Sequence, residues 1–95
     1  MDCFDWDDGN WSKCGKHGLT QDEIEYVFQN RPMVSPDKTK RDEELRYNAV
    51  GKNEKDKYVF IVFALRYRDG HRYIRPISAR YMHKKEVNHY EQRDT

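Results

Sequence analysis

The sequence predicts one α+β domain in which a short strand and two helices precede an antiparallel meander and a closing helix. Three observations carry this prediction. Thr20 and Glu23 form a capping-box pattern at the start of an amphipathic helix. Residues 58–65 are an uninterrupted apolar run of strand length. Asp69-Gly70 joins two strand-like runs and is among the strongest short signals for a β-hairpin.

The first strand is predicted over residues 4–7, where Phe4 and Trp6 alternate with polar residues. Asp7 or Asp8 can cap a helix over about residues 10–16, because a carboxylate accepts hydrogen bonds from the free N–H groups of the first turn. Gly18 then provides the left-handed turn that commonly ends a helix.

The capping box opens a second helix, in which Ile24, Val27 and Phe28 form one apolar stripe. Pro32 ends this helix, because proline lacks the N–H group that would continue it. Residues 35–44 are polar and charged, which predicts a loop before the meander.

Three strand-like runs follow, over residues 45–51, 58–68 and 71–77. The middle run is apolar at nearly every position, which predicts a central strand covered on both faces. Pro76 cannot donate to a strand ladder, so the third strand should end there or lie at an edge. The final helix is predicted over about residues 82–92, with Met82, Val87 and Tyr90 facing inward.

The distribution of charge indicates an anionic partner. A length of 95 residues leaves room for a single core, so residues 1–95 are expected to form one domain. The net charge of +1 divides into −4 over residues 1–48 and +5 over residues 49–95. Between Arg66 and Lys85 there are seven basic residues and one acid, Asp69. Such a cluster is typical of a surface that meets phosphate or carboxylate groups.

Several classes of protein are excluded by the same composition. No apolar run is long enough to cross a membrane, and the acidic start lacks the apolar region of a signal peptide. Cys3 and Cys14 alone do not indicate a disulfide scaffold, so we expect a cytoplasmic protein with reduced thiols. His83 and His89 are six residues apart and do not share a helix face, so neither a metal nor a cofactor is expected.

A group of cations forms the main candidate site: Arg46, Arg75 and Arg80, with Arg72 and Lys84 nearby in the sequence. Arg80 lies where a strand passes into a helix, and a helix start favours anions. Guanidinium groups could hold a phosphate and stabilise its growing charge; removing one such donor commonly lowers a rate by about 10²–10³. The alternative is solvated strand faces with ion pairs worth roughly 0–1 kcal/mol each, which composition alone favours.

Two smaller groups also contain candidate residues. Lys16 and His17 could supply charge or move protons, although a helix C-terminus equally favours both residue types. Glu44 shares a predicted strand face with Arg46 and could orient it or act as a base. An ordinary ion pair explains that pairing as well.

Four pieces of the chain occur together in a characteristic order: Phe4-Asp5-Trp6-Asp7 with Lys13 and Lys16-His17-Gly18-Leu19; Glu23 with Val27-Phe28; Glu44-Leu45-Arg46-Tyr47 running to Gly51; and Ile77-Ser78-Ala79-Arg80 with Glu86 and Tyr90-Glu91. In these pieces the chain resembles the BrnT family of toxins from bacterial type II toxin–antitoxin modules, over residues 4–91.

The resemblance implies a RelE-like fold, metal-independent cleavage of RNA by the adjacent 2′-OH, and inhibition of translation. It implies Lys16, Arg46 and Arg80 as catalytic residues, with His17 and Glu44 second, and Arg75 as a substrate clamp. Arg72 and Lys84, which belong to the same group of cations, are expected to contact RNA as well. It also implies a BrnA-like ribbon-helix-helix antitoxin, in a heterotetramer that meets operator DNA only through the antitoxin. The alternatives are a non-catalytic toxin-like protein that binds an antitoxin and co-represses its operon, and a simple RNA-binding module.

Overall fold

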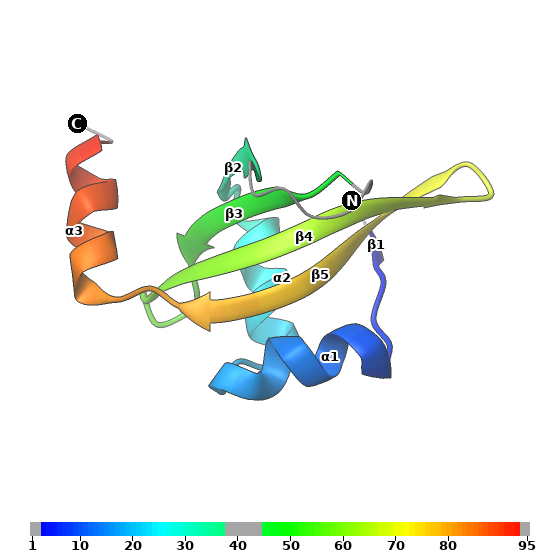
Figure 1. Cartoon of the computed structure of the whole chain (residues 1–95), viewed down its shortest axis with the longest axis horizontal. Helices are drawn as coiled ribbons and strands as arrows, with labels where there is room; N and C mark the ends of the chain where they lie inside the picture. Colours follow the sequence, from blue (N-terminus) through cyan, green and yellow to red (C-terminus); the bar gives the residue numbers. More distant parts are fainter. Residues whose placement is uncertain (1–2, 38–44, 94–95) are drawn as a thin grey trace.

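The computed structural model describes residues 3–37 and 45–93. In chain order the elements are β1 (Cys3–Phe4), α1 (Asp8–Cys14), the 3-10 turn η1 (Gly15–His17), α2 (Gln21–Gln29), β2 (Met33–Pro36), β3 (Tyr47–Lys52), β4 (Tyr58–Arg68), β5 (His71–Tyr81) and α3 (Lys84–Arg93). The strands form one sheet in the order β1-β5-β4-β3-β2 (Figure 1). β1 runs parallel to β5, and the other neighbours are antiparallel. The predicted α+β class is confirmed.

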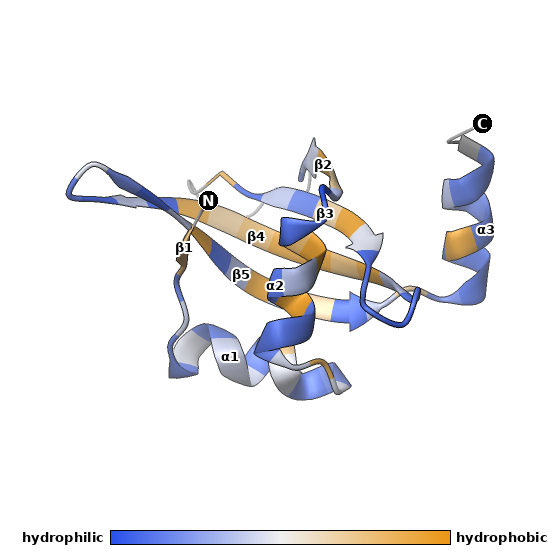
Figure 2. Ribbon diagram, turned by 180° about the vertical axis from the view of Figure 1, so that it is seen from behind, coloured by the Kyte–Doolittle hydropathy of each residue, from blue (hydrophilic) through white to orange (hydrophobic). Residues whose placement is uncertain are grey.

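The hydrophobic core lies between one face of the sheet and the helices α1 and α2, and the apolar residues of the strands gather behind α2 in Figure 2. Ile24 and Val27 of α2 are fully buried against this face, as the predicted stripe requires. Val59 and Ile61 of β4 are fully buried opposite them. Because burying one such side chain contributes about 1.5–3 kcal/mol, this layer accounts for much of the fold's stability.

The helix starts and the hairpin turn that local sequence patterns predicted are confirmed. Asp7 caps α1, since its side chain accepts from the N–H of Asn10, and Thr20 and Glu23 complete the capping box of α2. Asp69 and Gly70 both adopt left-handed backbone angles, with φ of 52° and 80°. These angles are those of a type I′ turn, whose twist matches the flanking strands of a hairpin.

The other face of the sheet, called here the open face, is lined by every second residue of the strands. The registers of β2, β3, β4 and β5 place one residue from each strand side by side in a row: Met33, Val50, Phe60 and Arg80. The helix α3 meets the end of this face, where Tyr90 packs edge to face on Tyr58. Among residues 3–37 and 45–93, α1 and α2 pack on the opposite side.

Two expectations for the meander were wrong. β4 is the central strand, but the helix layer covers only one of its faces, and Phe60 and Val62 on the open face are half-buried. Residues 33–36, partly assigned to a loop, form the edge strand β2, which is exposed along its whole length. The pairing comes from the free side of β3 rather than from apolar alternation in β2 itself. Residues 38–44 of the predicted loop lie outside the described residues.

The third strand does not end at Pro76 but continues to Tyr81. The reason is that β1 pairs with β5 only at Tyr73 and Ile74, so Pro76 lies beyond it, where a strand flanks one side alone. The carbonyl of Pro76 points to that free side and accepts from the amide of Asn10 at 2.8 Å. Pro76 faces the side of β5 that no strand pairs with at this point, so its lack of an N–H group removes no ladder bond, just as for a proline in an edge strand.

Candidate functional site

Arg80 lies near the end of β5 on the open face. Its guanidinium carbon is 4.9 Å from the centre of the Phe60 ring, which faces it across the strand pair. Glu86 of α3 accepts from both terminal nitrogens, at 2.7 and 2.9 Å. Glu86 also accepts from the N–H of His83 at 2.9 Å, and so closes the start of α3. The side chain of Arg80 is 35% exposed, so an anion can reach it from solvent.

The electrostatics of this pair keep both groups charged. Hydrogen bonds from Arg80, and secondarily from the N–H of His83, lower the pKa of Glu86 to about 2. The same contact with Glu86 raises the pKa of Arg80, against a smaller opposing effect of burial. The bidentate contact and the Phe60 ring hold the guanidinium in one orientation. A cation that is already oriented stabilises developing charge most effectively, because it does not have to reorganise during the reaction.

Arg46 immediately precedes β3, and strand alternation places it on the open face with Asn48 and Val50. Its Nε atom is buried and, among the described residues, has no hydrogen-bond partner; the same holds for Oδ1 of Asn48. Val50 is in the row of Arg80, four residues from Arg46 along the strand and two strands across. Strand spacings then put the Cα atoms of Arg46 and Arg80 roughly 16 Å apart. Both arginines lie on the open face, but their side chains would have to extend nearly fully for the two guanidiniums to contact one phosphate.

Arg75 is held by carboxylates near the first strand. Its guanidinium lies 3.0 Å from Oδ2 of Asp7 and 3.4 Å from Oδ2 of Asp5, and Arg68 contacts Asp5 at 2.8 Å. The Arg75 contact, followed by the N–H of Asn10, lowers the pKa of Asp7. Only 17% of the Arg75 side chain is exposed. These contacts give Arg75 a structural role that ties β5 to β1 and α1, in addition to any contact with RNA.

The remaining candidates lie near the two ends of β5, the end with Arg80 and the end at the hairpin. Lys16 and His17 are exposed on η1, which contacts β5. Lys84 is exposed in the first turn of α3. Arg72 is exposed beside the hairpin, eight residues before Arg80 and therefore about 27 Å away along an extended strand. Glu44 lies outside the described residues.

Sequence reasoning had not assigned a role to Glu86, nor to the ring of Phe60. One available signal for Glu86 was its position three residues after His83, because a Glu at that spacing often closes a helix start. No local pattern marked Phe60, whose contact with Arg80 depends on the register of β4 with β5.

The described residues contain no group of three or more His, Cys, Asp or Glu side chains arranged to hold a metal ion. Burial raises the pKa of Cys14 to about 11, which leaves its thiol protonated near neutral pH. None of the described helices is long and apolar enough to span a membrane.

The fold and site together define a small α+β protein with helices on one face of its sheet and an oriented arginine on the other. Residues 6–86 match the family model described as "Ribonuclease toxin, BrnT, of type II toxin-antitoxin system". The chain therefore belongs to the BrnT family, and the resemblance seen in its sequence is confirmed. Membership makes it a ribonuclease toxin with an antitoxin as partner. A search of curated proteins found no match.

Proposed function

We propose that this toxin is an endoribonuclease that inhibits translation by cleaving RNA without a metal ion. The observation that carries the proposal is the oriented guanidinium of Arg80, which lies on the open face above Phe60 and within reach of solvent. A phosphate is bound well by a bidentate guanidinium, which Glu86 occupies with a carboxylate in the free protein. An RNA phosphate would displace the Glu86 carboxylate from Arg80, or share the guanidinium with it.

In the proposed reaction the 2′-OH attacks the adjacent phosphorus, and the bond from phosphorus to the 5′-oxygen of the next nucleotide breaks. Arg80 stabilises the charge of the pentacovalent state, with Arg46 contacting the same strand of RNA further along the open face. Lys16 or His17 moves protons or neutralises charge, which their exposed position on η1 beside β5 supports. Glu44 is a second candidate for the base.

The cations Arg72, Arg75 and Lys84 are proposed to contact RNA outside the reacting phosphate. Arg72 and Lys84 are exposed at opposite ends of β5 and suit contacts with a long strand. Arg75 would have to share its charge with Asp5 and Asp7, so its contribution to RNA binding should be the smallest of the three.

The proposed partner is a BrnA-like ribbon-helix-helix antitoxin, which neutralises the toxin in a cytoplasmic heterotetramer and binds operator DNA itself. The fold is proposed to be RelE-like. A second candidate function is that of a non-catalytic toxin-like protein that binds the antitoxin and co-represses its operon. The contact of Arg80 with Glu86 favours this candidate specifically, because it makes the site a receptor for a carboxylate, such as one on an acidic antitoxin segment.

The test is to incubate the purified toxin, freed of antitoxin, with a defined RNA in EDTA. Wild type should give discrete cleavage, and Arg80→Ala should be slower by about 10²–10³. Lys55→Ala removes an exposed cation from the turn between β3 and β4 and serves as the control. Intact RNA from folded wild type, with and without ribosomes, would favour the non-catalytic candidate.

A further inference from the structure

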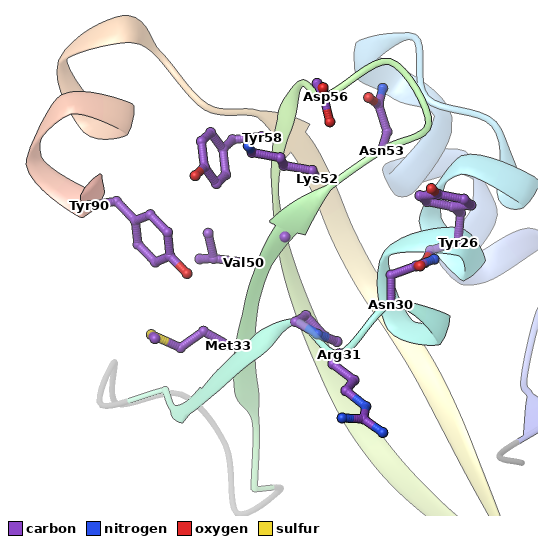
Figure 3. Close-up of a pocket in the computed structure, with 12 residues that line it drawn as sticks. Tyr26, Asn30, Arg31, Met33, Val50, Lys52, Asn53, Asp56, Tyr58 and Tyr90 are labelled. Atoms are coloured by element: carbon purple, nitrogen blue, oxygen red, sulfur yellow. The ribbon is translucent and has the colours of Figure 1, made fainter. Parts of the chain in front are cut away.

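A pocket of about 510 Å³ is lined by the end of α2 and the turn after it, by β2, by β3 and the turn that follows, by the start of β4 and by Tyr90 of α3. Figure 3 shows Tyr90 on one side of this space, with Tyr58, Val50 and Met33 facing it from the sheet. Three strands and a helix supply these side chains, which are up to 57 residues apart in the sequence, so no local pattern could have marked the pocket. A volume in this range accommodates one small planar ligand.

The chemistry of the walls is that of a site for a flat, polar-edged ring. The rings of Tyr58 and Tyr90 are 5.3 Å apart with an interplanar angle of 64°. Lys52 adds a positive charge, with its Nζ 5.1 Å from the centre of the Tyr58 ring, and the lining also contains Arg31 and one acid, Asp56. Met33 is 52% exposed and gives an apolar floor that solvent can reach. Aromatic faces next to a cation are what unpaired bases of single-stranded RNA bind.

The pocket adjoins the proposed phosphate position. Val50, in its wall, is in the same row of the open face as Arg80, with Phe60 between them. Two strand spacings separate their Cα atoms by about 9.6 Å. Tyr58 lies on the same face of β4 as Phe60 and two residues away, or about 6.8 Å. These separations are within the reach of one or two nucleotides.

We propose that this pocket is a nucleobase subsite, which takes one unpaired base of the RNA whose neighbouring phosphate contacts Arg80. The inference rests on the proposed function, because it assigns the substrate of the same site. The competing explanation is that Tyr90 only anchors α3, to which the hydrogen bond from the hydroxyl of Tyr58 to Glu91, at 3.3 Å, also contributes.

The experiment measures binding of a short 2′-O-methylated RNA, which lacks the attacking hydroxyl, by fluorescence anisotropy at fixed salt. An abasic nucleotide is placed at each position in turn. Wild type should lose affinity by about 5- to 150-fold at one position, since stacking on one aromatic ring contributes about 1–3 kcal/mol per base. Tyr90→Leu should bind the intact RNA as weakly as wild type binds that abasic RNA, and should be insensitive to the abasic substitution.

Two further variants separate stacking from the anchoring of α3. Tyr90→Phe keeps the ring and should retain wild-type affinity and sensitivity to the abasic position. Tyr67→Leu removes a tyrosine that is 70% exposed at the hairpin end of β4, and should leave binding unchanged. Equal affinity of folded wild type for intact RNA and for every abasic RNA would overturn the subsite while leaving cleavage in EDTA intact. Loss of both RNA binding and cleavage in wild type would instead overturn the proposed function and the subsite with it.

Discussion

Replacing Asn10 by alanine should destabilise this protein more than its place in a short helix suggests. Asn10 is 3% exposed, and its amide nitrogen donates to the carbonyls of Asp5 at 2.9 Å and Pro76 at 2.8 Å. Its amide oxygen accepts from the N–H of Asp7 at 2.8 Å. The substitution leaves two buried carbonyls and one N–H without partners, at about 1–3 kcal/mol each. Because water can enter the space of the lost amide, we expect a total loss of about 2–4 kcal/mol.

The measurement is urea unfolding of Asn10→Ala followed by circular dichroism, with a thermal melt alongside. For a domain of this size the expected loss corresponds to a fall in Tm of about 10–25 °C. Asn30→Ala is the matched control, because Asn30 also donates to a backbone carbonyl, that of Tyr26 at 2.8 Å, but is exposed. The control should change stability by no more than about 0.5 kcal/mol. Equal effects of the two substitutions would refute the argument that the large loss arises because the Asn10 amide and its partners are buried.

Three other predictions concern stability and reactivity. Glu86→Gln should lower the free energy of unfolding by at most about 1 kcal/mol at pH 7, because the pair with Arg80 is one-third exposed. The folded-state pKa of Glu86 is about 2 against an ordinary 4.5, so this stabilisation is complete above about pH 4.5 and disappears as the pH falls towards 2. A variant whose deficit persists unchanged at pH 2 in urea titrations would argue against the pair as its cause. Gly51→Ala should cost about 1–3 kcal/mol in the same titration, since its methyl group would lie 2.9 Å from a side chain of α2; a neutral result would mean that α2 yields easily. A thiol reagent should modify exposed Cys3 quickly and buried Cys14 only on unfolding, and mass spectrometry showing equal rates would contradict this burial.

The elements that the sequence predicted well are those set by neighbouring residues. The caps of α1 and α2, the hairpin at Asp69 and Gly70, and the central place of β4 all follow from local hydrogen bonds, backbone preference or apolar content. Prediction failed where a distant segment supplies the partner. β2 has no strong pattern of its own and exists because β3 offers it a free edge.

The sequence by itself determined the α+β class, the family, and the presence of an arginine at the junction of the last strand and helix. Only the tertiary structure decided what surrounds that arginine. The register of β4 with β5 puts Phe60 under Arg80, and the docking of α3 brings Tyr90 to Tyr58. Glu86 is only six residues from Arg80 and meets its guanidinium because α3 begins directly after β5. The physical reason is that strand register and helix docking are fixed by burial of the whole sheet face, so residues far apart in the chain meet without any local signal.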